Sequence, residues 1–186
     1  MVRIGGIDYS LTSPSICIYN GDKDKFNFDK CNIFFLSKTK KYSNYSHKNI
    51  DGQENYSDFS CPEQRYDFIS DWAMDILISN DIQKITLEDY SYGSTGKVFH
   101  IAENTGLLKW KLWQAEIDLE VVAPTVVKKF ASGKGNADKE RMYESFIEET
   151  LRNLNEELES KSKKVGNPIS DIVDSYYICK MGLATA

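Results

Sequence analysis

The chain has 186 residues, of which 41% are hydrophobic and 27% are charged, and this composition fits one globular domain rather than several. Its formal net charge is −5, so the chain as a whole is not a polycation, and any polyanion would have to meet a local basic face. No apolar run is long enough to cross a bilayer, and the N-terminus lacks the pattern of a signal peptide. We therefore expect a cytoplasmic protein with no membrane contact.

The N-terminal part of the chain predicts three antiparallel strands. The apolar run at 4–7 indicates the first strand, and residues 15–19, rich in β-branched and aromatic side chains, indicate the second after a polar turn around Pro14. A third strand is expected within 26–36, which ends in an apolar run. Together they would form one side of a sheet.

Residues 37–61 have a different composition, with many Ser, Asn, Tyr and Lys residues, few aliphatic side chains and no sustained period. This pattern predicts a long polar loop or a partly ordered insertion. Loops of this length are uncommon without a role.

From Pro62 onward, helices and strands alternate, which is typical of an α/β fold with a mixed sheet. The apolar spacing and the breakers predict a helix from Pro62 to about Asn80, a strand at 82–88, a helix at 98–116, a strand at 117–122, a short helix from Pro124, a longer helix at 137–158 and a terminal helix at 169–182.

Four acidic residues stand at the ends of predicted elements. Asp8 follows the first apolar strand, and Glu88 ends the strand at 82–88. Asp171 and Asp174 are three residues apart, so they share one face of the terminal helix near its start. Taken singly, each has an ordinary explanation: a turn former, a rim residue, a helix-dipole partner or a solvated side chain. Asp89 competes with Glu88 because adjacent strand residues face opposite ways.

Taken together, the four carboxylates predict a divalent-metal site. Like charges at close range repel, and burying them without a counter-ion is costly. Hard oxygen ligands with no cluster of His or Cys nearby favour Mg²⁺, with Mn²⁺ as a substitute, over Zn²⁺. Two such ions can activate a water nucleophile and stabilise the leaving oxygen of a phosphodiester.

A basic segment at 126–141 contrasts with the acidic chain, because it has five basic and two acidic residues. Its glycines would let the backbone approach a phosphate closely, and its cations would attract DNA independently of sequence. A solvated loop with chance charge is the alternative. The candidate DNA-binding residues here are Lys128, Lys129, Lys134, Lys139 and Arg141.

Four segments, in this order, resemble the RuvC family of Holliday-junction resolvases, within the RNase H-like nuclease superfamily. They are Gly-Ile-Asp8-Tyr-Ser, Ile-Thr-Leu-Glu88-Asp-Tyr-Ser-Tyr-Gly, the stretch 123–142, and Ser-Asp171-Ile-Val-Asp174-Ser-Tyr-Tyr-Ile. The third is the most specific, because its P-T-x-V-K-K and G-x-G-x-A-D-K elements occur together. The resemblance covers most of the chain outside 37–61 and 156–165.

The resemblance implies an RNase H-like fold, with helices on both faces of a mixed five-stranded sheet, over a single nuclease domain at 1–186. It also implies a homodimer that resolves four-way DNA junctions by paired symmetric nicks. The compact size of the chain suits a bacterial cell or phage-infected host. Asp8, Glu88, Asp171 and Asp174 would be the catalytic and metal-binding tetrad. Lys128 and Lys139 would face DNA. Ser10 stands where the family usually has glycine, and the polar insertion at about 37–61 is extra.

Aromatic residues near the predicted site have two interpretations. Tyr90, Tyr92 and Phe99 could stack on an unpaired base or wedge a branch point, or they could pack in the core or at its rim. Phe99, Trp110 and Trp113 on the second helix are expected to belong to the core or to a dimer seam. The acidic stretch 142–160 is expected to face away from DNA.

Other functions stay open from the sequence. The same site could act on flaps, replication forks or RNA–DNA hybrids. A catalytically silent DNA-binding module is a second alternative, although all four acids are present. A small actin-like phosphotransferase is a third, because its opening strand can also read Gly-Ile-Asp, but its phosphate loops and two-lobed length are absent.

Overall fold

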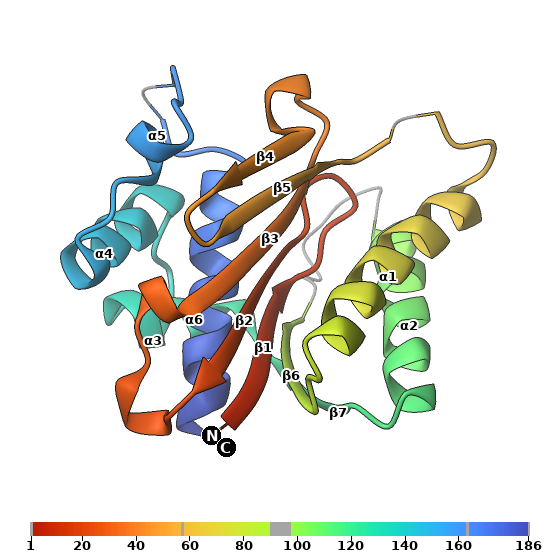
Figure 1. The fold of residues 1–186 in the computed structure, drawn as a ribbon, viewed down its shortest axis with the longest axis horizontal. Helices are drawn as coiled ribbons and strands as arrows, with labels where there is room; N and C mark the ends of the chain where they lie inside the picture. The colour runs from red at the N-terminus through yellow and green to blue at the C-terminus, as the bar shows by residue number, and fades with distance from the viewer. Residues whose placement is uncertain (1, 57, 90–97, 163, 186) are drawn as a thin grey trace.

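The computed structural model describes residues 2–56, 58–89, 98–162 and 164–185. Seven strands form one sheet in the order β4-β5-β3-β2-β1-β6-β7 (Figure 1). The strands are β1 (Val2–Asp8), β2 (Ser15–Gly21), β3 (Cys31–Ser37), β4 (Asn44–His47), β5 (Ile50–Glu54), β6 (Lys84–Glu88) and β7 (Asp118–Val122). The helices are α1 (Pro62–Ser79), α2 (Val98–Gln114), α3 (Pro124–Ser132), α4 (Lys139–Thr150), α5 (Leu154–Glu157) and α6 (Ile169–Ala184), with short 3₁₀ turns η1 (Lys23–Lys25), η2 (Phe28–Lys30) and η3 (Lys40–Tyr42).

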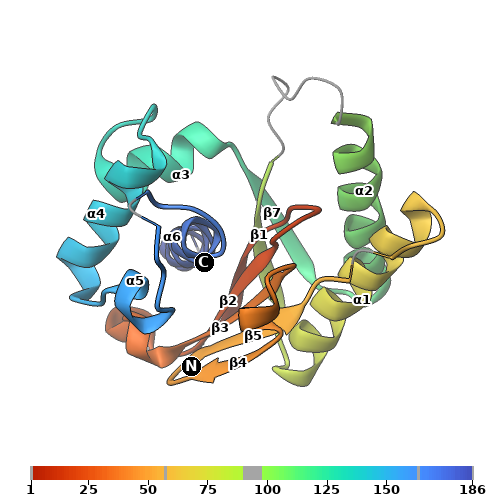
Figure 2. The same ribbon diagram turned by 90° about the horizontal axis from the view of Figure 1, so that it is seen from above.

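The predicted α/β class with a mixed sheet is confirmed. Strands β1, β2 and β3 are antiparallel neighbours, whereas β6 and β7 continue the sheet in parallel with β1. Helices cover both faces: α1 and α2 lie on one face, and α3 to α6 lie on the other (Figure 2). None of the helices in the described ranges has the length and apolar character needed to cross a membrane.

The expected number of five strands is wrong, because residues 37–61 add two more. Strand β5 pairs in parallel with β3, and β4 pairs antiparallel with β5. Aromatic packing fixes them, since the rings of Tyr42 and Tyr45 lie 5.8 and 6.3 Å from the ring of Phe35. Ile50 is completely buried. The segment gives a weak strand signal because β4 is a short edge strand held largely by backbone hydrogen bonds, with polar side chains facing solvent.

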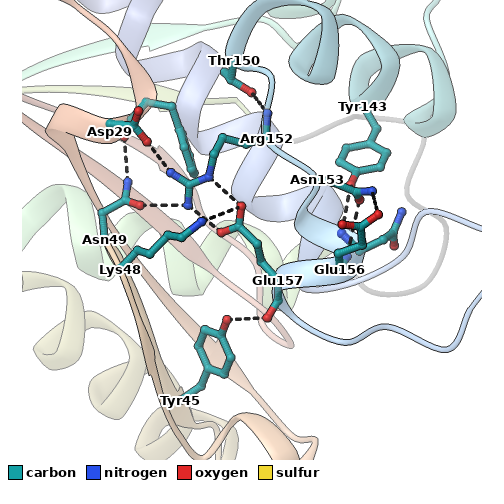
Figure 3. A network of polar contacts seen from close by, with 12 residues as sticks. Asp29, Tyr45, Lys48, Asn49, Tyr143, Thr150, Arg152, Asn153, Glu156 and Glu157 are labelled. Atoms are coloured by element: carbon teal, nitrogen blue, oxygen red, sulfur yellow. Dashed lines mark hydrogen bonds and ion pairs between the residues drawn. The ribbon is translucent and has the colours of Figure 1, made fainter.

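The single long helix expected at 137–158 is also wrong. Helix α4 ends at Thr150, Leu151 adopts a left-handed conformation with φ 57°, and the short helix α5 begins at Leu154. The Arg152 side chain turns inward there and meets Glu157, with 2.6 Å between Nε and Oε1 (Figure 3). A polar cluster therefore breaks the helix where the sequence pattern continues.

Glycine at one position of β1 lets helix α6 lie directly on the sheet. A Cβ atom at Gly6 would come within 2.1 Å of the backbone nitrogen of Cys179 and 2.6 Å of the Ser175 carbonyl oxygen. Any larger residue would therefore push α6 away from β1. The close contact sets the start of α6 beside the C-terminal end of β1, where the acidic residues lie.

Candidate active site

The four acidic residues come together at one end of the sheet. Asp8 is the last residue of β1 and Glu88 the last residue of β6, and these parallel strands are in register with Ile7 opposite Leu87. Asp171 and Asp174 lie in the first two turns of α6. Asp8, Glu88 and Asp174 line one cavity of about 890 Å³, and Asp171 is buried next to Asp8. The expected meeting of the four side chains is therefore observed.

Burial and mutual repulsion make these carboxylates poor acids. Burial, reinforced by the charges of Asp171, Asp174 and Glu88, raises the pKa of Asp8 well above its ordinary value. Burial and Asp174 raise the pKa of Glu88 to about 7, although Lys128 lowers it. The cluster therefore holds protons near neutral pH unless positive charge enters.

The two helical acids behave in the same way. Burial raises the pKa of Asp171 to about 6, against the opposing effects of the Ser13 hydroxyl and Lys139. Burial and Asp171 raise the pKa of Asp174 to about 7, again against nearby lysines. Asp89, the sequence alternative to Glu88, also lines the cavity. Glu88 and Asp174 line the same cavity as Asp89.

Two of the predicted DNA-binding lysines face the acids. Lys128 on α3 and Lys139 at the start of α4 both line the cavity. The Lys139 ammonium donates to Asn167 Oδ1 at 3.2 Å and to Ser170 Oγ at 3.1 Å, which directs it toward the start of α6. These contacts hold a cation at the mouth of the carboxylate cluster.

The other basic candidates are not in the cavity lining. Lys129 and Lys134 are exposed on and after α3. Arg141 forms ion pairs with Glu144 at 3.2 Å and Glu148 at 3.7 Å on its own helix. The charge pattern alone could not separate these residues from Lys128 and Lys139, because direction around a helix depends on its packing, whereas the motif resemblance singled out those two lysines.

The aromatic candidates divide into two groups. Tyr90 and Tyr92 lie outside the described residues, so their stacking role stays a prediction. Phe99, Trp110 and Trp113 on α2 are 78%, 52% and 75% exposed, so the interpretation that they belong to the core of this chain is wrong. The dimer-seam alternative stays a prediction.

The donor atoms of the acidic cluster suit a hard divalent cation. Asp171 Oδ2 is buried and has no hydrogen-bond partner within the described residues, so the folded chain leaves an oxygen lone pair unsatisfied. No group of three or more His, Cys, Asp or Glu side chains in those ranges forms a ready metal cage. Mg²⁺ does not require one, because it usually takes one or two carboxylates and completes its shell with waters and substrate phosphate. The cluster fits that mode of binding.

The opposite wall of the cavity was missed from the sequence. It is built by the first turns of α1 and α2 and includes Arg65, Tyr66 and His100. The Tyr66 hydroxyl donates to Glu103 Oε2 at 3.1 Å and lies 2.6 Å from His100 Nδ1. Arg65 donates to the carbonyl oxygen of Leu11, in the loop that follows Asp8. A signal existed, because ligands often bind where the carboxyl ends of strands meet the starts of helices.

No protein-family model matches this sequence, and no curated protein is significantly similar to it in sequence. Solved structures, however, are similar in fold over nearly the whole chain. Thermus thermophilus RuvC in complex with a Holliday junction substrate has a TM-score of 0.60 and 13% identity, over 98% of both chains. The chain has the RuvC-like fold.

Two further structures support this assignment. The yeast mitochondrial Holliday junction resolvase Ydc2 has a TM-score of 0.59 and 15% identity, over 98% of this chain and 78% of that chain. Fowlpox virus resolvase, in complex with Holliday junction DNA, has a TM-score of 0.54 and 15% identity, over 99% of this chain and 98% of that chain. The resemblance stated from the sequence motifs is thereby confirmed for the RuvC-like fold.

Proposed function

We propose that this protein is a metal-dependent endonuclease that resolves four-way DNA junctions by paired symmetric nicks. One observation carries the proposal: Asp8, Glu88 and Asp174 converge beside Lys128 and Lys139 in a single cavity, with Asp171 buried next to Asp8. An acidic cluster alone would repel DNA, whereas acids and cations at one opening suit a phosphodiester with divalent ions. The similar structures named above include RuvC and fowlpox virus resolvase bound to Holliday junction DNA.

The residues of the cavity have distinct roles in this proposal. Asp8, Glu88, Asp171 and Asp174 would hold Mg²⁺, or Mn²⁺ in its place. When bound, these ions would supply a water nucleophile at neutral pH and charge stabilisation for the leaving oxygen. The Lys128 and Lys139 ammonium groups would bind the oxygens of the scissile phosphate, which orients the DNA above the carboxylates.

Paired nicks require two copies of the site, and α2 offers a surface for pairing. Phe99, Trp110 and Trp113 are exposed, and at 100° per residue they project from one side of the helix. Large exposed aromatic side chains that share a face are typical of protein–protein contacts. We therefore place the seam of a homodimer on this face of α2.

A substrate panel tests the proposed function. Labelled immobile four-way junction, flap, fork, RNA–DNA hybrid and linear duplex are incubated at equal concentration with the protein, with and without Mg²⁺. We expect Mg²⁺-dependent nicks at symmetric positions in the junction and little cutting of the duplex. Faster cutting of the flap, fork or hybrid than of the junction would show that this other nucleic-acid structure is the substrate. The absence of metal-dependent cutting of every substrate in the panel would contradict the proposal.

A further inference from the structure

We propose that the two segments outside the motif resemblance form a second DNA-binding surface, which holds the phosphate backbone of a duplex arm away from the cavity. The surface consists of Lys38 and Lys40, between β3 and β4, and Lys161 and Lys164, between α5 and α6. We refer to these residues as the distal lysine surface. The inference rests on the proposed function, because it takes branched DNA as the ligand.

Direct contacts bring the two segments together although they are far apart in the sequence. The Lys41 ammonium donates to the carbonyl oxygens of Leu158 at 2.6 Å and Glu159 at 2.7 Å. The Tyr42 hydroxyl donates to the same Leu158 oxygen at 3.2 Å. Lys38 and Lys40 lie within three residues of Lys41, Lys161 lies two residues from Glu159, and the Lys164 carbonyl oxygen accepts from the Ser162 hydroxyl at 2.8 Å. The four lysines therefore share one region of the surface.

A polar cluster beneath the surface holds both segments in place. Arg152 reaches Glu157 and Asn49, with 3.3 Å between its Nη2 and Asn49 Oδ1, and it also pairs with Asp29 (Figure 3). The Tyr45 hydroxyl donates to the Glu157 carbonyl oxygen at 2.8 Å. The strands β4 and β5 and the helix α5 therefore form a connected unit that can present side chains at fixed positions.

The two connecting segments of this unit carry lysines but no acidic residues. Residues 37–48 contain four lysines and no acid, and residues 160–168 contain three lysines and no acid. Lys41 and Lys48 are used internally, since they pair with Glu159 at 3.6 Å and Glu157 at 3.5 Å. The four residues of the distal lysine surface, in contrast, are exposed and form no ion pair with any described residue.

Two sets of hydrogen bonds connect the segments that carry the distal lysine surface to the active site. Next to Lys38, the Ser37 carbonyl oxygen accepts from the Asn55 backbone, and the Asn55 side chain donates to the carbonyl oxygen of Thr12, in the loop after Asp8, at 2.8 Å. Beyond Lys164, Asn167 accepts from Lys139, which lines the cavity. The β3–β4 and α5–α6 connections lie at the same end of the molecule as the C-terminal end of β1 and the start of α6 (Figure 1).

These features favour a nucleic-acid backbone as the ligand. Lysines without an acidic partner attract phosphate without reading sequence, and each contact releases bound counter-ions from DNA. A second contact away from the scissile phosphate would fix the direction of an arm as it leaves the branch point. The acidic stretch 142–160 flanks the surface and would limit where the arm can lie.

Matched double variants test the distal lysine surface. Lys38→Gln with Lys40→Gln, and Lys161→Gln with Lys164→Gln, are compared with the control Lys25→Gln with Lys30→Gln, which removes the same charge near η1 and η2. All proteins carry Asp8→Asn so that the DNA stays uncut. Binding to a four-way junction and to a duplex of one arm's length is measured by fluorescence anisotropy as a function of salt concentration.

We expect each distal double variant, but not the control, to weaken junction binding. The slope of log affinity against log salt should fall in magnitude by about 0.9 for each phosphate that the protein no longer binds. The proposal would be overturned if the distal double variants had the same salt slopes as the control variant. It would also be overturned if they bound anionic lipid vesicles more weakly than the parent while their DNA binding was unchanged. Thermal unfolding midpoints equal to the parent show that the variants fold.

The same data separate this inference from the proposed function. If the parent binds the junction no better than the duplex, the junction-resolving function is wrong, whereas the salt slopes on the duplex still test the lysines. If the parent prefers the junction but the distal variants match the control, only the distal lysine surface is wrong.

Discussion

Two regions of this molecule bury charge in opposite ways. At the end of β1, four carboxylates of like sign share one site, and the pKa of each is raised. Around α5, Arg152 meets carboxylates of opposite sign. Hydrogen bonds to Glu157 raise the pKa of Arg152. Burial favours the neutral form of Glu157, but Arg152 still holds its pKa below the ordinary value.

The difference indicates which region serves stability and which serves chemistry. Opposite charges with hydrogen bonds satisfy one another, so the cluster around Arg152 supports the fold. Like charges in a buried site cost folding free energy, and a chain retains them only where a cation or a reaction requires them. Substitutions in the two regions should therefore change stability in opposite directions.

The largest expected effect is on DNA cleavage by the acidic cluster. Asp174→Asn should lower the rate of Mg²⁺-dependent junction cleavage by about a thousandfold or more, because it removes a ligand of the ions that would stabilise charge in the transition state. Junction binding measured by gel shift should persist. An Asp174→Asn protein that cleaves at the parental rate would contradict the assignment, and Glu144→Gln on the outer face of α4 serves as a control.

The next largest effect is a loss of stability in the second region. Arg152→Ala should lower the free energy of unfolding by about 3 kcal/mol, because it leaves the Glu157 carboxylate, only 11% exposed, without its hydrogen-bonded partner and with only the more distant Lys48 at 3.5 Å. Urea denaturation measures the change. A loss no greater than that of a surface variant such as Arg141→Ala would show that the cluster does not stabilise the fold.

A smaller effect is the pH dependence of stability in the metal-free protein. The raised pKa values of Glu88 and Asp174 mean that the unfolded chain releases these protons at lower pH than the folded chain does. Below the ordinary pKa values of these side chains, they therefore do not lower the free energy of unfolding. Their destabilising effect grows as the pH rises to about 7.

Asp174→Asn isolates this cost. Relative to the parent, the variant should gain stability with rising pH, by about 1.4 kcal/mol for each unit by which the Asp174 pKa is raised. Thermal or urea unfolding of both proteins, from about pH 4 to about pH 8, gives the difference over the window in which those protons are released. Mg²⁺ should reduce it. A difference that is constant with pH would contradict the raised pKa.

The smallest effect concerns a single hydrogen bond between β4 and α5. Tyr45→Phe removes the hydroxyl that donates to the Glu157 carbonyl oxygen, and it should lower the free energy of unfolding by about 1 kcal/mol. Tyr56→Phe, at an exposed position, is the matched control. Equal stability of the two variants would show that this bond does not hold α5 against β4.

The sequence predicted the first region better than the second, for physical reasons. Asp8 and Glu88 follow apolar strands, and Asp171 and Asp174 have helical spacing, so local patterns already place them at the ends of elements. The acids then meet because parallel strands end at one edge of a sheet and because Gly6 admits α6.

The second region depends on contacts that no local pattern encodes. Strand β4 is polar and pairs at the sheet edge, and Arg152 interrupts a stretch that otherwise continues a helical pattern. Its partners Asp29 and Asn49 lie more than a hundred residues away, so only the folded chain identifies them. The exposure of Trp110 and Trp113 was equally hidden, because an apolar stripe on a helix is usually buried.

The most direct test of the central claim is Mn²⁺ binding to the acidic cluster, measured by electron paramagnetic resonance on the parent and on Asp8→Asn, with junction cleavage assayed on the same samples. We predict that the parent binds Mn²⁺ and cuts the junction, and that Asp8→Asn binds Mn²⁺ more weakly and does not cut. Equal Mn²⁺ binding and equal cutting by the two proteins would contradict the claim that these carboxylates hold the ions that cleave DNA.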